Sequence, residues 1–104
     1  AWNFGTETKF SVSVKKIVQF IIKFWGNGTI KIFNANRFRE QQNLQIDSSK
    51  AKKLLHWKTT YSTKKAVEVT TDWYSKVLRE KKNPSDVTNQ QIKEYMKNSS
   101  KKFN

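Results

Sequence analysis

The chain has 104 residues, which suffice for one small domain and leave little room for a second hydrophobic core. Its net charge of +13 favours an anionic partner such as nucleic acid, acidic lipid or a phosphorylated ligand. The chain contains no cysteine, which excludes disulfides, thiolate metal sites and cysteine nucleophiles. Aromatic residues make up 13% of it, so we expect a packed core and not a disordered tail.

The longest apolar run spans residues 17–25 and is interrupted by Gln19 and Lys23. It is far shorter than the ~20 residues that a membrane-spanning helix requires. Residues 1–5 (AWNFG) show no basic stretch followed by an apolar one, the pattern of a secretory signal. We therefore predict no membrane partner and a cytoplasmic location.

The first predicted element is an amphipathic helix over residues 11–25. Its lysines share one face, and the opposite face carries Val14, Ile17, Val18, Ile21, Ile22, Phe24 and Trp25. This apolar arc is wide, which indicates packing from two sides or a surface that meets a neighbouring domain. Gly26 should end the helix, because glycine tolerates the positive φ of a helix cap, and the alternation over residues 29–33 predicts a short strand.

Residues 34–43 are polar and aperiodic, which predicts a loop able to reach a ligand. A short helix is predicted over residues 48–56, with Ala51 on its buried side. Ser62 or Thr63 should cap a longer helix over residues 63–80, whose Trp73 face we expect to be buried. Pro84 should separate this helix from the next, because proline lacks an N–H and disfavours helix at the residue before it.

The last predicted helix covers residues 88–97. Thr88 and Gln91 have the spacing of a capping box, and Val87 has the spacing to pack on Ile92 as a hydrophobic staple. The residues expected to face inward are Ile92, Tyr95 and Met96. We expect residues 99–104 to fray.

Residue types suited to catalysis are scarce. There is one histidine, no glycine-rich phosphate loop and no closely spaced set of acids suited to a metal. His56 follows an apolar helix turn, where a structural or capping role is favoured over that of a general base or ligand. Glu68 and Asp72 lie among lysines on one helix face and are interpreted as solvated ion pairs. No catalytic residue is therefore predicted in this chain.

The aromatic and basic residues leave an alternative open. Exposed aromatic rings can stack bases in a single-strand groove, although most rings here fall on apolar helix faces, where core packing is favoured. The lysines are dispersed over every element without a recognisable nucleic-acid motif. A small basic protein that binds nucleic acid or another anion stays as the alternative function.

Five segments carry motifs in colinear order. They are residues 1–5 (AWNFG), 44–51 (LQIDSSKA), 54–59 (LLHWKT), 66–74 (AVEVTTDWY) and 86–95 (DVTNQQIKEY). They resemble the motifs AWNFGP, LxLDxSKA, LLGWKP, EAxxxTxxWY and TxxQIxxY of the carboxy-terminal third of CDP-glucose 4,6-dehydratases, which are extended short-chain dehydrogenases. The chain departs from these motifs at Thr6, His56 and Thr59, which stand where the family has proline, glycine and proline.

The resemblance implies a mainly helical α/β fold. Residues 1–98 would form the small substrate-binding lobe of an extended short-chain dehydrogenase, without the Rossmann domain that carries the glycine-rich NAD loop and the catalytic tyrosine and lysine. It implies contact with a nucleotide-sugar such as CDP-glucose through Asn3, Arg39 and Glu40. An arginine in this loop also suits phosphate recognition.

These observations lead to one hypothesis and two rivals. The first is a sugar-nucleotide-binding fragment that binds no cofactor itself, is inactive alone, and needs an amino-terminal domain holding NAD to act as a lyase in polysaccharide biosynthesis. One rival is the basic nucleic-acid- or anion-binding protein. The other is the remnant of a degraded gene without a function of its own.

Overall fold

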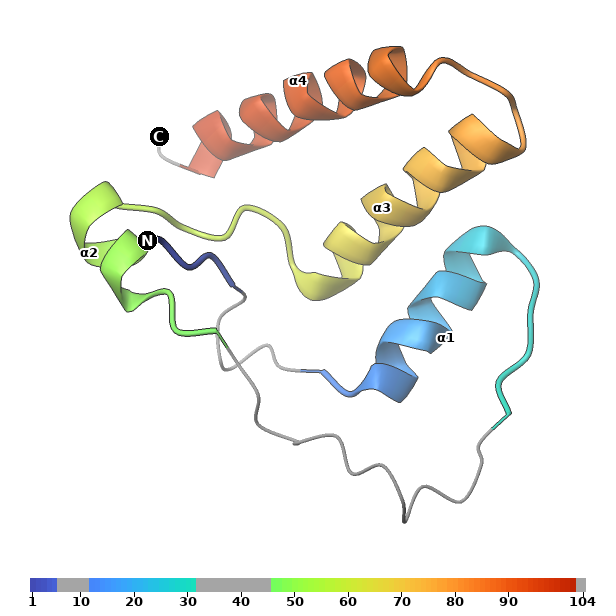
Figure 1. Cartoon of the computed structure of the whole chain (residues 1–104), viewed down its shortest axis with the longest axis horizontal. Coiled ribbons are helices and arrows are strands. Elements are labelled where there is room, and N and C mark those ends of the chain that lie inside the picture. Colours follow the sequence, from blue (N-terminus) through green and yellow to red (C-terminus); the bar gives the residue numbers. More distant parts are fainter. Residues whose placement is uncertain (6–11, 32–45, 103–104) are drawn as a thin grey trace.

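The computed structural model describes residues 1–5, 12–31 and 46–102 (Figure 1). The helices in this part of the chain are α1 (Val14–Trp25), α2 (Ser49–Leu55), α3 (Thr63–Leu78) and α4 (Pro84–Lys102). They confirm a mainly helical chain. No strand occurs within the described residues, so the α/β description is not confirmed there: residues 29–31 are irregular, and residues 32–33 of the expected strand lie outside the described part.

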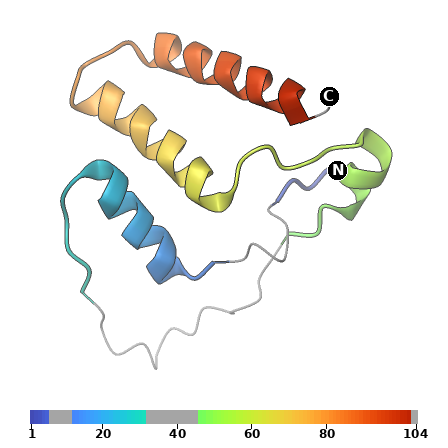
Figure 2. The same cartoon turned by 180° about the vertical axis from the view of Figure 1, so that it is seen from behind.

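Three helices form one layer with α3 in the middle, as the views from front and back show (Figures 1 and 2). α1 runs parallel to α3, and their carboxyl ends are tied where the Arg79 guanidinium donates to the Trp25 carbonyl oxygen at 2.8 Å. α4 returns antiparallel to α3, held where Gln91 Nε2 donates to the Val69 carbonyl oxygen at 2.8 Å. The short helix α2 stands beside the amino-terminal segment, apart from this layer.

The ends of α1 and α3 follow ordinary capping chemistry. Ser13 Oγ accepts from the Lys16 amide at 3.2 Å at the start of α1. Gly26 ends that helix with φ 103°, a conformation that glycine adopts without strain. Ser62 Oγ caps α3 by accepting from the Lys65 amide at 3.1 Å. The predicted roles of Gly26 and Ser62 are therefore confirmed.

The start of α4 differs from the prediction. The helix begins at Pro84, four residues before the expected Thr88. Asn83 Oδ1 accepts from the amides of Ser85 at 2.9 Å and Asp86 at 3.2 Å, so the asparagine caps the helix. Proline suits the first helical position because its missing N–H would have had no partner there. Pro84, which was expected to separate two helices, is therefore the first residue of α4.

The predicted capping box and hydrophobic staple are consequently wrong. Thr88 Oγ1 accepts from the Trp73 indole N–H at 2.9 Å, and Gln91 reaches α3 instead of the backbone of its own helix. Ile92, the expected partner in the staple, is exposed. In the stretch where fraying was predicted, α4 continues to Lys102.

The hydrophobic core is small. Among the described residues, Ala51 and Val87 are the buried hydrophobic ones, and no large side chain is fully buried. Trp73 was expected to be buried and is only partly buried. The three residues of α4 that were expected to face inward are all exposed: Ile92, Tyr95 and Met96. Within the described residues no second layer packs on the other face of this layer of helices, whereas a domain normally packs two or three layers around its core.

Thr59 sits in the chain between α2 and α3 with a buried hydroxyl that has no hydrogen-bond partner. Burying such a group without a partner costs about 1–3 kcal/mol, so we expect Thr59→Val to raise the free energy of unfolding by about 1 kcal/mol. Urea unfolding followed by circular dichroism measures this. The buried neighbour Thr60 has an interaction partner, so Thr60→Val should lower stability, and a gain in both variants would contradict the assignment.

Candidate functional site

The amino-terminal segment is fixed to α2 by one buried serine. Ser48 Oγ accepts from the Gly5 amide at 2.8 Å and donates to the Gly5 carbonyl oxygen at 3.4 Å, across 43 residues of chain. A Cβ atom on Gly5 would lie 3.2 Å from the Cβ of Ile46 and 3.3 Å from its carbonyl oxygen, closer than most such contacts. Glycine at this position therefore lets the two segments approach. We call residues 1–5 and 46–58 the amino-terminal corner.

Two aromatic side chains of the corner reach solvent. Trp2 is 43% exposed, and the Lys50 ammonium lies 4.6 Å from the centre of its indole ring while donating to the Ala1 carbonyl oxygen at 3.2 Å. Phe4 is 50% exposed and meets Trp57 edge to face, with ring centres 5.2 Å apart. Asn3, between Trp2 and Phe4 in sequence, is also exposed.

Of the three residues expected to contact a ligand, the structure places Asn3. It lies in the corner, between Trp2 and Phe4 in sequence, within the amino-terminal segment that runs beside α2 (Figure 1). Arg39 and Glu40 lie outside the described residues. Lys50 and Trp57, which were not expected at a ligand site, lie in the same corner. Both belong to motifs of the resemblance, but the motifs do not show which residues meet in space, because their relation to residues 2–4 depends on the long-range Ser48 contact.

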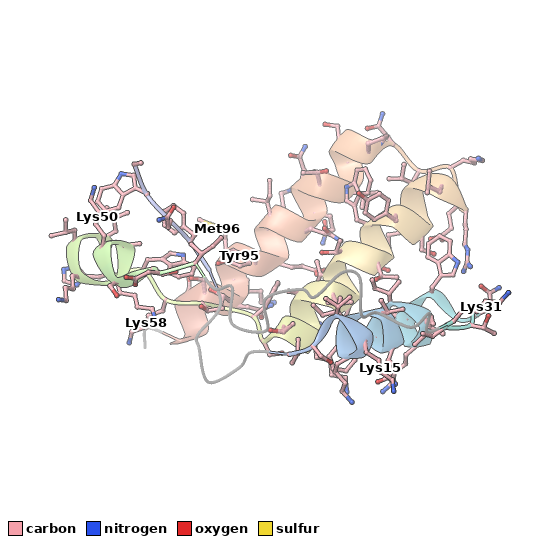
Figure 3. The ribbon with its side chains drawn as sticks, turned by 60° about the horizontal axis from the view of Figure 1, so that its bottom comes forward. Lys15, Lys31, Lys50, Lys58, Tyr95 and Met96 are labelled. Atoms are coloured by element: carbon pink, nitrogen blue, oxygen red, sulfur yellow. The ribbon has the colours of Figure 1, made fainter. Side chains whose placement is uncertain are left out.

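The charge of the corner is positive. Its one acidic residue, Asp47, accepts through Oδ1 from the hydroxyl and the amide of Ser49, the latter at 2.9 Å. These hydrogen bonds, with smaller contributions from Lys52 and Lys53, hold the pKa of Asp47 below its ordinary value. Asp47 is therefore ionised at neutral pH and bonded at the start of its own helix. Lys50, Lys53 and Lys58 are exposed in the same corner, and Figure 3 labels two of them.

His56 ends α2 in the left-handed conformation, with φ 53°, and its backbone N–H bonds to the Ala51 carbonyl oxygen. This confirms the capping role expected for it. This conformation is sterically unfavourable for residues other than glycine. The glycine of the family motif LLGWKP, which resembles residues 54–59, would therefore suit the same position.

A groove of about 290 Å³ lies between α3 and α4. Its charged lining comprises Asp72, Lys76, Lys82, Asp86 and Glu94. Lys76 Nζ lies 2.9 Å from Asp72 Oδ2, and this hydrogen bond raises the pKa of Lys76. Lys65 and Glu68 form a second pair at 3.8 Å, so Glu68 and Asp72 are solvated ion pairs as predicted. The described residues hold no group of three or more acids or histidines suited to a metal ion.

Comparison with known proteins gives no relative. No protein-family model, curated protein or solved structure matches this chain. None of the helices in the described part is long and apolar enough to cross a membrane. The function must therefore be inferred from the geometry of the chain and from its sequence.

The second surface of interest is the uncovered side of the helix layer. Successive residues are about 100° apart around a helix, so Tyr74 lies about 160° around α3 from Asp72, and Ile92 about 160° around α4 from Glu94. Since Asp72 and Glu94 line the groove, Tyr74 and Ile92 belong to the opposite side. We call this side the apolar face; its exposed large side chains on α3 and α4 are Tyr74, Leu78, Ile92 and Met96.

Proposed function

We propose that this chain is a sugar-nucleotide-binding lobe that acts only when docked on a separate dinucleotide-binding domain, as its resemblance to CDP-glucose 4,6-dehydratases implies. The observation that carries the proposal is the apolar face. Met96 is 62% exposed and Leu78 56% exposed, on helices that no second layer covers in the described part of the chain. Several large apolar side chains exposed on one side of a helix pair favour a site of protein association.

The division of labour follows from what each part supplies. The amino-terminal corner offers Asn3 and lysines to an anionic ligand, while a dinucleotide-binding domain would supply the glycine-rich loop, NAD and the catalytic tyrosine and lysine. A hydride transfer requires the cofactor to be positioned against the sugar, which the residues of this chain alone do not provide. We therefore expect the chain alone to be inactive. We also expect it to act in the cytoplasm.

The test is reconstitution with the separately expressed amino-terminal domain of a CDP-glucose 4,6-dehydratase. We expect association in titration calorimetry, and formation of the 4-keto sugar from CDP-glucose with NAD only in the mixture. Ile92→Asp should weaken association by more than about 100-fold, because an unpaired charge would be buried in the interface.

The matched control is Gln90→Asp, which adds the same charge on the groove side of α4 and should leave association within about twofold. If the two variants weaken association equally, the apolar face is not the interface. Product formation by the chain alone would also contradict the proposal.

A further inference from the structure

We infer that Trp2 and Phe4 form a site on which a nucleobase stacks. Lys50 and Lys53 would bind the phosphate attached to that base, so the ligand would be a nucleotide. The inference rests on the proposed function, because it names the end of the sugar nucleotide that the amino-terminal corner would hold. The observations behind the stacking site concern the side chains of the amino-terminal corner and do not involve the apolar face.

The two rings are exposed yet anchored. Their Cα atoms are two residues apart and so at most about 7 Å from one another. Phe4 is held edge to face by Trp57, and the following Gly5 is bound to Ser48. An exposed ring on an anchored backbone stacks a base at little cost in conformational entropy, and such stacking contributes about 1–3 kcal/mol per base.

The cations lie where a phosphate attached to that base can reach them. The Lys50 ammonium is already beside the Trp2 ring, and one of its three donors is used by the Ala1 carbonyl oxygen. Lys53 is exposed three residues further along α2, on the same side of the helix as Lys50. Asp47 carries one negative charge against the four lysines of residues 46–58, so the corner keeps a net positive charge.

This combination distinguishes the corner from the apolar face. Both surfaces expose aliphatic side chains, which in the corner are Ile46, Leu54 and Leu55 and on the apolar face Leu78, Ile92 and Met96. The corner differs in that a lysine ammonium lies beside the exposed ring of Trp2. In the corner, aromatic rings and lysines occur together, which is the combination that recognises a base and its phosphate. The corner is therefore assigned to a nucleotide and the apolar face to a protein.

The experiment is a titration of the isotope-labelled chain followed by NMR, using CDP, cytidine and inorganic pyrophosphate. We expect CDP to shift the Trp2 indole N–H signal and to bind at least about tenfold more tightly than pyrophosphate, since a stacked base contributes about 1.4 kcal/mol or more. Trp2→Ala should weaken CDP binding about tenfold, and Trp2→Phe should retain it within about threefold.

Two control variants match these changes outside the corner. Tyr74→Ala removes an equally exposed ring from α3, and Lys93→Gln removes an exposed lysine from α4, as Lys50→Gln does from α2. Both controls should leave the Kd for CDP within about twofold, whereas Lys50→Gln should raise it about fivefold. Far-UV circular dichroism checks that every variant keeps its helix content.

Three outcomes would overturn the inference. Equal affinity for pyrophosphate and CDP would make the corner an ordinary basic surface. An unchanged Kd in Trp2→Ala would place the ligand elsewhere. Binding of oligo(dC) without binding of CDP, with a steep loss of affinity as salt rises, would make the partner a polynucleotide.

The two proposals can fail separately. Association with the amino-terminal domain without binding of CDP would refute the stacking site and leave the docked lobe standing. Binding of CDP that depends on Trp2, without any association, would support the stacking site and refute the docked lobe.

Discussion

Replacing Trp73 by alanine is expected to lower the free energy of unfolding by about 3 kcal/mol. The indole ring packs between α3 and α4, meets Tyr74 edge to face at 5.1 Å, and donates its N–H to Thr88 Oγ1. Truncating a core tryptophan costs about 3–5 kcal/mol, and partial burial places Trp73 at the lower end. With so few buried hydrophobic residues, this loss is a large share of the total stability.

Urea unfolding followed by far-UV circular dichroism measures the effect. Leu78→Ala is the matched control on the same helix, because its exposed side chain should contribute less than about 0.5 kcal/mol. Trp73→Phe separates the ring from the hydrogen bond and should cost about 1 kcal/mol. A loss in Leu78→Ala as large as in Trp73→Ala would show that the α3–α4 contact is not the core of the fold.

Replacing Ser48 by alanine should have the second largest effect, about 2 kcal/mol, because it leaves the partly buried Gly5 amide and carbonyl without their partner. The amino-terminal segment should then detach from α2. Hydrogen exchange at the Gly5 amide should become faster, and the affinity for CDP should fall along with it, since the Trp2 ring would lose its fixed position.

Ser49→Ala is the control, because the neighbouring serine is exposed and bonds only to Asp47. It should leave the exchange rate of the Gly5 amide unchanged within about twofold. Slow exchange at Gly5 in Ser48→Ala would show that the segment is held by its aromatic contacts instead of the serine.

The sequence predicted the helices well where local chemistry decides them. The apolar period of α1, the glycine at position 26 and the serine at position 62 are all read within one helical turn, and the structure confirms them. The start of α4 was missed for a local reason too. Pro84 was interpreted as a break, although proline is equally at home at the first helical position after an asparagine cap.

Burial could not be predicted in the same way. A periodic face shows which side of a helix is apolar, but not whether anything in the same chain covers it. Ile92 and Met96 were expected inside because they are apolar, and they are exposed because none of the other described elements covers that side of the layer. The candidate site shows the same limit, since the contact of Gly5 with Ser48 joins residues 43 positions apart and leaves no periodic signal.

The contact between Arg79 and Trp25 joins the ends of α1 and α3, which are far apart in the sequence. The guanidinium carbon lies 3.7 Å from the centre of the indole ring, and the two residues are 54 positions apart. The hairpin of α3 and α4 closes a short turn, whereas docking of α1 closes a long loop, so α1 should join last. Closure entropy grows only slowly with loop length, by about 0.6 kcal/mol for each doubling. The connection between α1 and α2 is therefore the part of the chain where insertions would disturb stability least.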